Sequence, residues 1–279
     1  MDVRRVFRGV WASAWVGWEA ESNWTEPFIF ISLQVIRPLA STMLFPLLYI
    51  VGMNLTGQPI DTQYLTYIFI GTAFLTPYVF AAESGSQTVS QDRERYGVLK
   101  SIYITPSSLR IYYAGRFLGV AAVSVVSTTA SILISYIFLR NIVGVDLQIS
   151  LKYHVGFFVA LGCIYAGAFA IYNILVSINL LTNKLHWSLS YYFLGLLYLF
   201  GEVLFPASTI SPYAEPLTHL LPINPALNTL RSSLGMQMQN SIDGAIVAST
   251  LWVVLGAAVF TRAVKQARAK GLLDKVGWW

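Results

Sequence analysis

The sequence predicts an all-α integral membrane protein with six transmembrane helices, and three observations support this class. Of its 279 residues, 56% are hydrophobic and only 11% are charged, which lies outside the range of soluble globular domains. Apolar runs of about 20 residues, the length that crosses a bilayer core, recur along the chain rather than once. These runs are continuous rather than alternating, which favours helices over a membrane β-barrel.

Residues 1–27 predict an amphipathic helix that lies along the membrane surface. Apolar residues recur there at helical spacing, and three arginines can occupy another face. Tryptophan suits the boundary between headgroups and acyl chains, so the helix fits the inner leaflet. A soluble helix packed on a partner protein would show the same pattern. The apolar residues are Val3, Phe7, Val10, Trp11, Ala14, Trp15 and Trp18, and the basic ones are Arg4, Arg5 and Arg8.

Six spans are expected between residues 28 and 262, each near or above the length of about 20 residues that crosses the membrane. The single cysteine, Cys163, lies inside one of them, so it cannot form an intramolecular disulfide and fits a packing role. The predicted spans are 28–53, 64–83, 112–139, 153–180, 187–205 and 242–262.

The basic residues predict that both termini are cytoplasmic. With the N-terminus inside, 14 of the 18 lysines and arginines fall on the cytoplasmic side, as the positive-inside rule requires. Only Arg140, Lys152 and Arg231 fall outside, and Arg37 lies within the first span. The tail, residues 263–279, belongs to the basic inner side. The net charge of +5 therefore reflects topology and attraction to anionic headgroups. We expect a multi-pass protein of the plasma membrane.

Motifs for the common chemistries of enzymes are missing from the sequence. It contains no P-loop, no glycine-rich dinucleotide fingerprint, no HExxH pair and no CxxC pair. His154, His186 and His219 have no metal-ligand spacing among them. We therefore expect no catalytic residue, no metal site and no cofactor held by this chain, and a membrane enzyme is the weakest functional class.

The stretch DRERYGVLKSIYI between the second and third spans combines charges with apolar residues at helical spacing. A solvated loop that follows the positive-inside rule would have no use for this apolar stripe. Thr105 and Pro106 then end the pattern. We expect a cytoplasmic helix over residues 93–106 that meets a soluble partner. Its contact residues would be Arg93, Glu94, Arg95, Val98, Leu99, Lys100 and Tyr103.

The connection between the fifth and sixth spans is apolar yet rich in proline. Proline stops helices, and the leucine and isoleucine content demands burial. Residues 205–234 are therefore expected to dip back into the outer leaflet as short broken helices and to cap the protein. The residues assigned to this outer gate are Glu202, Pro206, Pro212, Pro222 and Pro225.

Within the first span, Arg37 is costly at the depth of the bilayer core unless it is paired or snorkels. Glu83 on the second span lies at a similar inferred depth, because each helical residue adds about 1.5 Å. The two residues are the candidates for an intramembrane charge pair. Such a pair would either change along a translocation path or lock the two helices together.

Taken in order, these features resemble the transmembrane subunits of type-2 ABC exporters, which are similar to the eukaryotic G subfamily. The resemblance lies in QDRERYGVLKSIYITPSSLRIYYAGR, LFPASTISP and LPINPALNTLR, and it covers nearly the whole chain. It implies six helices after an interfacial helix, and a coupling helix that docks onto a separate ATPase. Two ATPase subunits, which would bind ATP and Mg, and two permease copies would together form the working transporter. The tail ending LLDKVGWW departs from the family pattern.

The resemblance further implies outward movement of an amphipathic, drug-like or lipid-linked substrate by a permease homodimer. Its substrate path would include Gly162, Ala166, Ala170 and Asn173. The alternative is an ion- or proton-coupled secondary transporter in which Arg37, Glu83 and Glu202 carry the coupling. Against this alternative, the sequence shows no matching pair of interrupted helices of the kind that inverted repeats produce. Fold-level analogy does not choose among drug, polysaccharide and lipid substrates.

Overall fold

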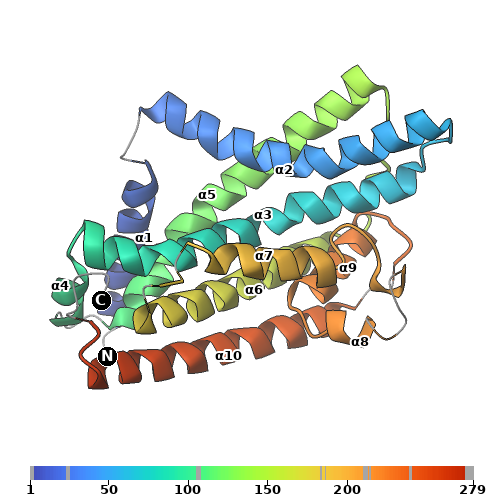
Figure 1. Cartoon of the computed structure of the whole chain (residues 1–279). Coiled ribbons are helices and arrows are strands. Elements are labelled where there is room, and N and C mark those ends of the chain that lie inside the picture. Colours follow the sequence, from blue (N-terminus) through green and yellow to red (C-terminus); the bar gives the residue numbers. More distant parts are fainter. Residues whose placement is uncertain are drawn as a thin grey trace.

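The computed structural model describes residues 3–22, 26–104, 108–182, 184–185, 187–209, 213, 215–238 and 241–273, and all regular structure in this part of the chain is helical. Five helices are long and apolar enough to cross a membrane (Figure 1), as in a multi-pass membrane protein. The elements are α1 (Val3–Ser22), α2 (Pro27–Thr56), α3 (Thr62–Ser90), η1 (Gln91–Arg95), α4 (Leu99–Ile104), α5 (Leu109–Phe138), η2 (Leu139–Val143), α6 (His154–Leu181), α7 (Leu189–Phe200), η3 (Ala207–Thr209), α8 (Glu215–Thr218), α9 (Ile223–Ser233) and α10 (Ile242–Ala269).

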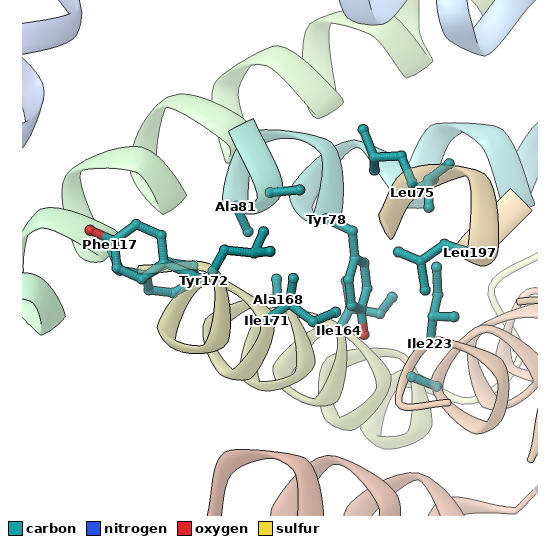
Figure 2. Packing of buried hydrophobic residues seen from close by; sticks show 14 of the residues in the cluster. Leu75, Tyr78, Ala81, Phe117, Ile164, Ala168, Ile171, Tyr172, Leu197 and Ile223 are labelled. Carbon is teal, nitrogen blue, oxygen red and sulfur yellow. The ribbon is translucent and has the colours of Figure 1, made fainter. Parts of the chain in front are cut away.

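The central helix of the bundle is α3, against which α2, α5, α6, α7 and α9 all pack. Figure 2 shows side chains of α3, α6, α7 and α9 that meet in one core, namely Tyr78, Ile164, Leu197 and Ile223 in that order. On the other side of α6 lies α10 (Figure 1). As a result α3 is almost entirely buried, whereas α2 and α10 expose long apolar faces of the kind that lipid covers.

Local sequence sets the helix ends. The Asp61 carboxylate accepts hydrogen bonds from the backbone N–H groups of Gln63 and Tyr64, which caps the start of α3. Ser108 caps α5 through a hydrogen bond from the N–H of Ile111. Gly57 ends α2 with a left-handed backbone that favours glycine.

The N-terminal helix α1 packs closely on α5. A Cβ atom at Gly119 of α5 would lie 2.6 Å from the carbonyl oxygen of Ala14, so only a glycine permits this approach. Phe7, Trp11 and Trp15 remain exposed on another face of α1. The apolar stripe predicted for this helix is therefore divided between packing inside the protein and a surface that suits a membrane.

The predicted spans and the helices differ most at residues 187–205. There the structure has α7, which is 12 residues long. At about 1.5 Å per residue this helix is too short to cross a bilayer core unaided. It ends at Phe200 with Gly201 as its C-cap, and Glu202 then adopts a left-handed backbone with a φ of 52°. In contrast, the predicted second span, 64–83, is part of a longer helical segment that runs to Arg95.

The two ends of the bundle carry different elements (Figure 1). The described chain starts and finishes at one end, where α4 also lies, and we call it the terminal end. The short helices α8 and α9 lie at the other end, which we call the opposite end. The two connections that the sequence singles out are therefore far apart in the molecule.

Candidate functional site

The connection between α3 and α5 turns sharply at the terminal end. The π-helical turn η1 first continues α3. Gly97 then adopts a left-handed backbone with a φ of 63°, and α4 begins after it. The single helix predicted over 93–106 is thus two helical pieces, because a positive φ breaks the ladder of helical hydrogen bonds. Leu99 is only 1% exposed and anchors α4 to the bundle. The side chain of Tyr103 and residues 105–106 lie outside the part that the structure describes.

Two charged residues of this connection are buried rather than presented to a partner. Asp92 faces Arg116 of α5, with 3.7 Å between a carboxylate oxygen and a guanidinium nitrogen. Arg93, which the sequence assigned to the docking surface, donates a hydrogen bond of 3.3 Å to the carbonyl oxygen of Leu180. These contacts tie α3, α5 and α6 together at the terminal end. Arg93 therefore belongs to the interior of the bundle in this conformation.

The N-terminal helix α1 joins the same cluster. Arg116 donates a hydrogen bond of 3.2 Å to the carbonyl oxygen of Val16 in α1. Two cavities, of about 430 and 440 Å³, lie where α1, α5 and the α3–α5 connection meet. Val16, Val98 and Tyr112 line both of them. Val98, another predicted docking residue, consequently faces α1.

The exposed part of the connection mixes charged and apolar side chains. Tyr96 is 43% exposed and Ile104 is 73% exposed. The Arg95 guanidinium lies 5.5 Å from the centre of the Tyr96 ring, within the range of a cation–π contact. Lys100 is also exposed, whereas Glu94 is half-buried. We call Arg95, Tyr96, Lys100 and Ile104 the α4 surface.

An ion pair joins α2 to α3 through the two residues for which the sequence suggests one. The Arg37 guanidinium donates two hydrogen bonds to the Glu83 carboxylate, one of them 2.7 Å long. The Arg37 side chain is nevertheless 65% exposed. A cavity of about 170 Å³ beside the pair has polar walls that include Gln34 and Gln87. Because an exposed charge is costly in lipid, this polar face requires water or another protein chain beside it.

Reversing one charge of the pair, with Arg37→Glu, should destabilise the protein by about 1 kcal/mol, because Arg37 is well exposed. Adding Glu83→Arg should recover part of the loss. The measurement is a double-mutant cycle on the unfolding of the purified chain in lipid nanodiscs. The exposed pair Arg140 and Asp146, 3.3 Å apart, is the matched control and should tolerate the same exchange. Strictly additive effects at Arg37 and Glu83 would contradict the pair.

At the opposite end, the segment between α7 and α10 forms the short helices η3, α8 and α9. Glu202 opens this segment in a backbone conformation that residues other than glycine rarely adopt. Its carboxylate accepts hydrogen bonds from the N–H of Ala207, at 3.1 Å, and from Nδ2 of Asn228, at 3.3 Å. The strained turn therefore holds a buried carboxylate in a fixed position.

The prolines predicted for the outer gate have distinct positions. Pro222 and Pro225 are buried at the start of α9, where the missing N–H of proline costs no helical hydrogen bond. Pro206 lines a cavity between the segment and α10. Pro212 lies outside the described residues. Re-entry of this segment into the bilayer stays a prediction.

A fully buried arginine, Arg231, connects α9 to α3. Its guanidinium lies 3.4 Å from the centre of the Tyr67 ring, and Nη2 donates hydrogen bonds of 3.1 Å to the carbonyl oxygens of Tyr67 and Val203. Gly71 of α3 makes room for it, since a Cβ atom there would lie 2.6 Å from Nη2 and 2.0 Å from the Val203 oxygen. Arg231 therefore pins the opposite-end segment to the central helix.

Sequence reasoning counted Arg231 only as an outward loop charge. The local signal is weak: Leu227, four residues before Arg231, shares its helix face, but Asn228, three residues before it, makes that face partly polar. Burial lowers the pKa of the Arg231 guanidinium, while Tyr67 and Glu202 raise it. The ordinary pKa of arginine is above about 12, so the side chain remains charged.

The four α6 residues assigned to a substrate path have different surroundings. Gly162 is exposed, Ala166 is half-buried, and Ala170 and Asn173 are buried. A Cβ atom at Gly256 of α10 would lie 2.8 Å from the carbonyl oxygen of Ala170, so the two helices pack backbone to backbone there. Asn173 donates a hydrogen bond back to its own helix. Within this chain the buried half of the predicted path serves helix packing.

Comparison with known proteins adds no family. No model of a protein family matches the chain, and no curated protein matches it either. Among the residues that the structure describes, no three histidine, cysteine, aspartate or glutamate side chains gather in a way that could hold a metal ion. The candidate sites are therefore the α4 surface with its buried Asp92–Arg116 support, the polar face around Arg37 and the opposite-end segment held by Arg231.

Proposed function

We propose that the chain is the permease subunit of an ATP-driven ABC exporter, with hydrolysis supplied by a separate ATPase subunit. The observation that carries the proposal is the α4 surface. It projects between two candidate spans at the terminal end, and it combines basic, aromatic and aliphatic side chains of the kind that protein interfaces use. On the assignment from the basic residues, this end is cytoplasmic.

A docking element that transmits force needs a stiff connection to the membrane helices. The connection proposed here runs from α4 through the buried Leu99 and η1 into α3. From Asp92 it continues to Arg116 of α5 and, through the Val16 carbonyl, to α1. Movement of a bound ATPase would thereby shift three helices together.

The polar face around Arg37 supports a second permease copy. Helix α2 exposes a charged side chain within a candidate span, and a symmetric partner would remove it from lipid. The substrate path would then lie between two subunits rather than inside one, where Ala170 packs closely against α10. The substrate would be amphipathic, drug-like or lipid-linked, and it would leave across the plasma membrane.

An ion- or proton-coupled secondary transporter is the second candidate. The observation that favours it is the presence of the Arg37–Glu83 pair within candidate spans, since ionisable residues at that depth mark ion pathways. A secondary transporter gives no role to the α4 surface. The two candidates therefore differ in whether a soluble ATPase must bind the terminal end.

The test is co-purification of the chain with a co-expressed ATPase subunit from the same genome. Ile104→Asp should weaken the association at least tenfold, because Ile104 is exposed and the change puts a charge into an apolar contact. Leu55→Asp is the matched control, since Leu55 is an exposed aliphatic residue at the far end of α2, and it should have no effect. Equal association of both variants would argue against the proposal.

A further inference from the structure

A cavity at the opposite end lies between the outer segment and α10. Its volume is about 680 Å³, within the range of about 300–1,000 Å³ that small organic ligands occupy. One wall is apolar and consists of α10 residues that are exposed, among them Val247, Leu251 and Leu255. The floor is polar and includes Glu202 and Asn228. The cavity is thus amphipathic.

The floor of the cavity has hydrogen-bond acceptors that no described residue fills, although Nδ2 of the adjacent Asn224 is a buried donor that also lacks a partner. Nδ2 of Asn228 donates to Glu202, at 3.3 Å, and to Oδ1 of Asn224, at 2.9 Å, which fixes the orientation of the Asn228 amide. Oδ1 of Asn228 is buried and has no hydrogen-bond partner among the described residues. The Glu202 carboxylate accepts two hydrogen bonds, although an ionised carboxylate can accept about four.

The carboxylate at the floor of the cavity points to a cationic hydrogen-bond donor as the ligand. Arg231 interacts electrostatically with Glu202 but donates its hydrogen bonds to the backbone carbonyls of Tyr67 and Val203. The Glu202 carboxylate takes its donors from Ala207 and Asn228, so within the described residues it forms no direct ion pair. Trp252 of α10 also lines the cavity, and its indole N–H donates a hydrogen bond of 2.7 Å to the carbonyl oxygen of Leu220.

We infer that this cavity binds amphipathic molecules that carry a protonated amine, with the ammonium group at Glu202 and Asn228 and the apolar chain along α10. An ammonium group has three donors and a positive charge, which match the open acceptors and the carboxylate. A free long-chain amine and the headgroup of phosphatidylethanolamine share this chemistry. Only the statement that the bound molecule is an export substrate rests on the proposed function.

The test is equilibrium binding of radiolabelled dodecylamine to the purified chain in phosphatidylcholine nanodiscs, with uptake by empty discs subtracted. Saturable binding is expected, and Glu202→Gln should weaken it at least tenfold while leaving the binding of dodecanol unchanged. Ala248→Phe, which fills the apolar part of the cavity, should weaken the binding of both molecules. Val254→Phe, at an exposed position on α10 outside the cavity, is the control and should weaken neither.

Adding phosphatidylethanolamine to the discs distinguishes the two sources of the amine. Competition with dodecylamine would identify the lipid headgroup as the ligand, and absence of competition would identify a free amine. Lack of saturable binding, or an unchanged affinity in both Glu202→Gln and Ala248→Phe, would overturn the site. Because neither ATP nor an ATPase is present, that result would leave the proposed function standing, and failure of the ATPase to associate would leave the binding result intact.

Discussion

Replacing Arg231 by methionine should lower the free energy of unfolding by about 3–6 kcal/mol, because it removes two buried hydrogen bonds from a charged donor, each worth about 1.5–3 kcal/mol. The variant leaves the carbonyl oxygen of Val203 without the donor that Arg231 supplies and removes the cation from the face of Tyr67. Methionine restores part of the volume but none of the hydrogen bonds. The measurement is denaturant unfolding in mixed micelles, together with protease resistance of the opposite end.

The control is the same substitution at an exposed arginine. Arg140 pairs with Asp146 at the surface, and its side chain is 58% exposed, so Arg140→Met should cost less than about 1 kcal/mol. Arg231→Lys keeps the charge but loses the planar fork, so its stability should lie between those of the native protein and Arg231→Met. Equal stability of Arg231→Met and Arg140→Met would show that α9 is held by other contacts.

The pair of Asp92 and Arg116 should produce the second large effect. Both residues are almost fully buried, so Asp92→Ala leaves an uncompensated guanidinium in the interior and should cost about 3–5 kcal/mol. Adding Arg116→Met should recover much of this loss, because the double variant removes both charges from the interior. A double-mutant cycle on the unfolding of the purified chain measures the coupling.

The control for this cycle is Asp146→Ala, which removes an exposed carboxylate that also faces an arginine. It should leave the stability nearly unchanged. If Asp92→Ala and Arg116→Met act additively, the two residues do not stabilise each other. The proposed mechanical link from the α4 surface to α5 would then lack its central contact.

Hydropathy predicted the membrane class and most helices, because long apolar runs need no tertiary information. It was less informative at residues 187–205, where the composition stays apolar but the helix ends after Phe200. The reason is the backbone of Glu202, whose left-handed conformation is held by hydrogen bonds from residues later in the chain. Such contacts are set by the fold and leave no periodic signal.

The candidate site shows the same difference between local and tertiary information. Helical spacing identified the connection before α5 as unusual and predicted that Arg93 and Leu99 contact a partner. The bundle buries both side chains instead. Gly97 divides the predicted helix, since a positive φ breaks a pattern that periodicity alone would continue. The burial of Arg231 could not be predicted in this way, because it depends on the close approach of α3 at Gly71 and so on how two distant segments pack.

The most direct test of the proposed coupling is the rate of ATP hydrolysis by the candidate ATPase when it is reconstituted with the chain in proteoliposomes. Residues 94–104 would be replaced by a glycine-serine linker, which keeps Asp92 and Arg93 in the bundle. We expect the native chain to bind the ATPase and raise its hydrolysis rate, and the linker variant to insert and fold but do neither. Normal binding and normal stimulation by the linker variant would contradict the account and favour an ion-coupled transporter.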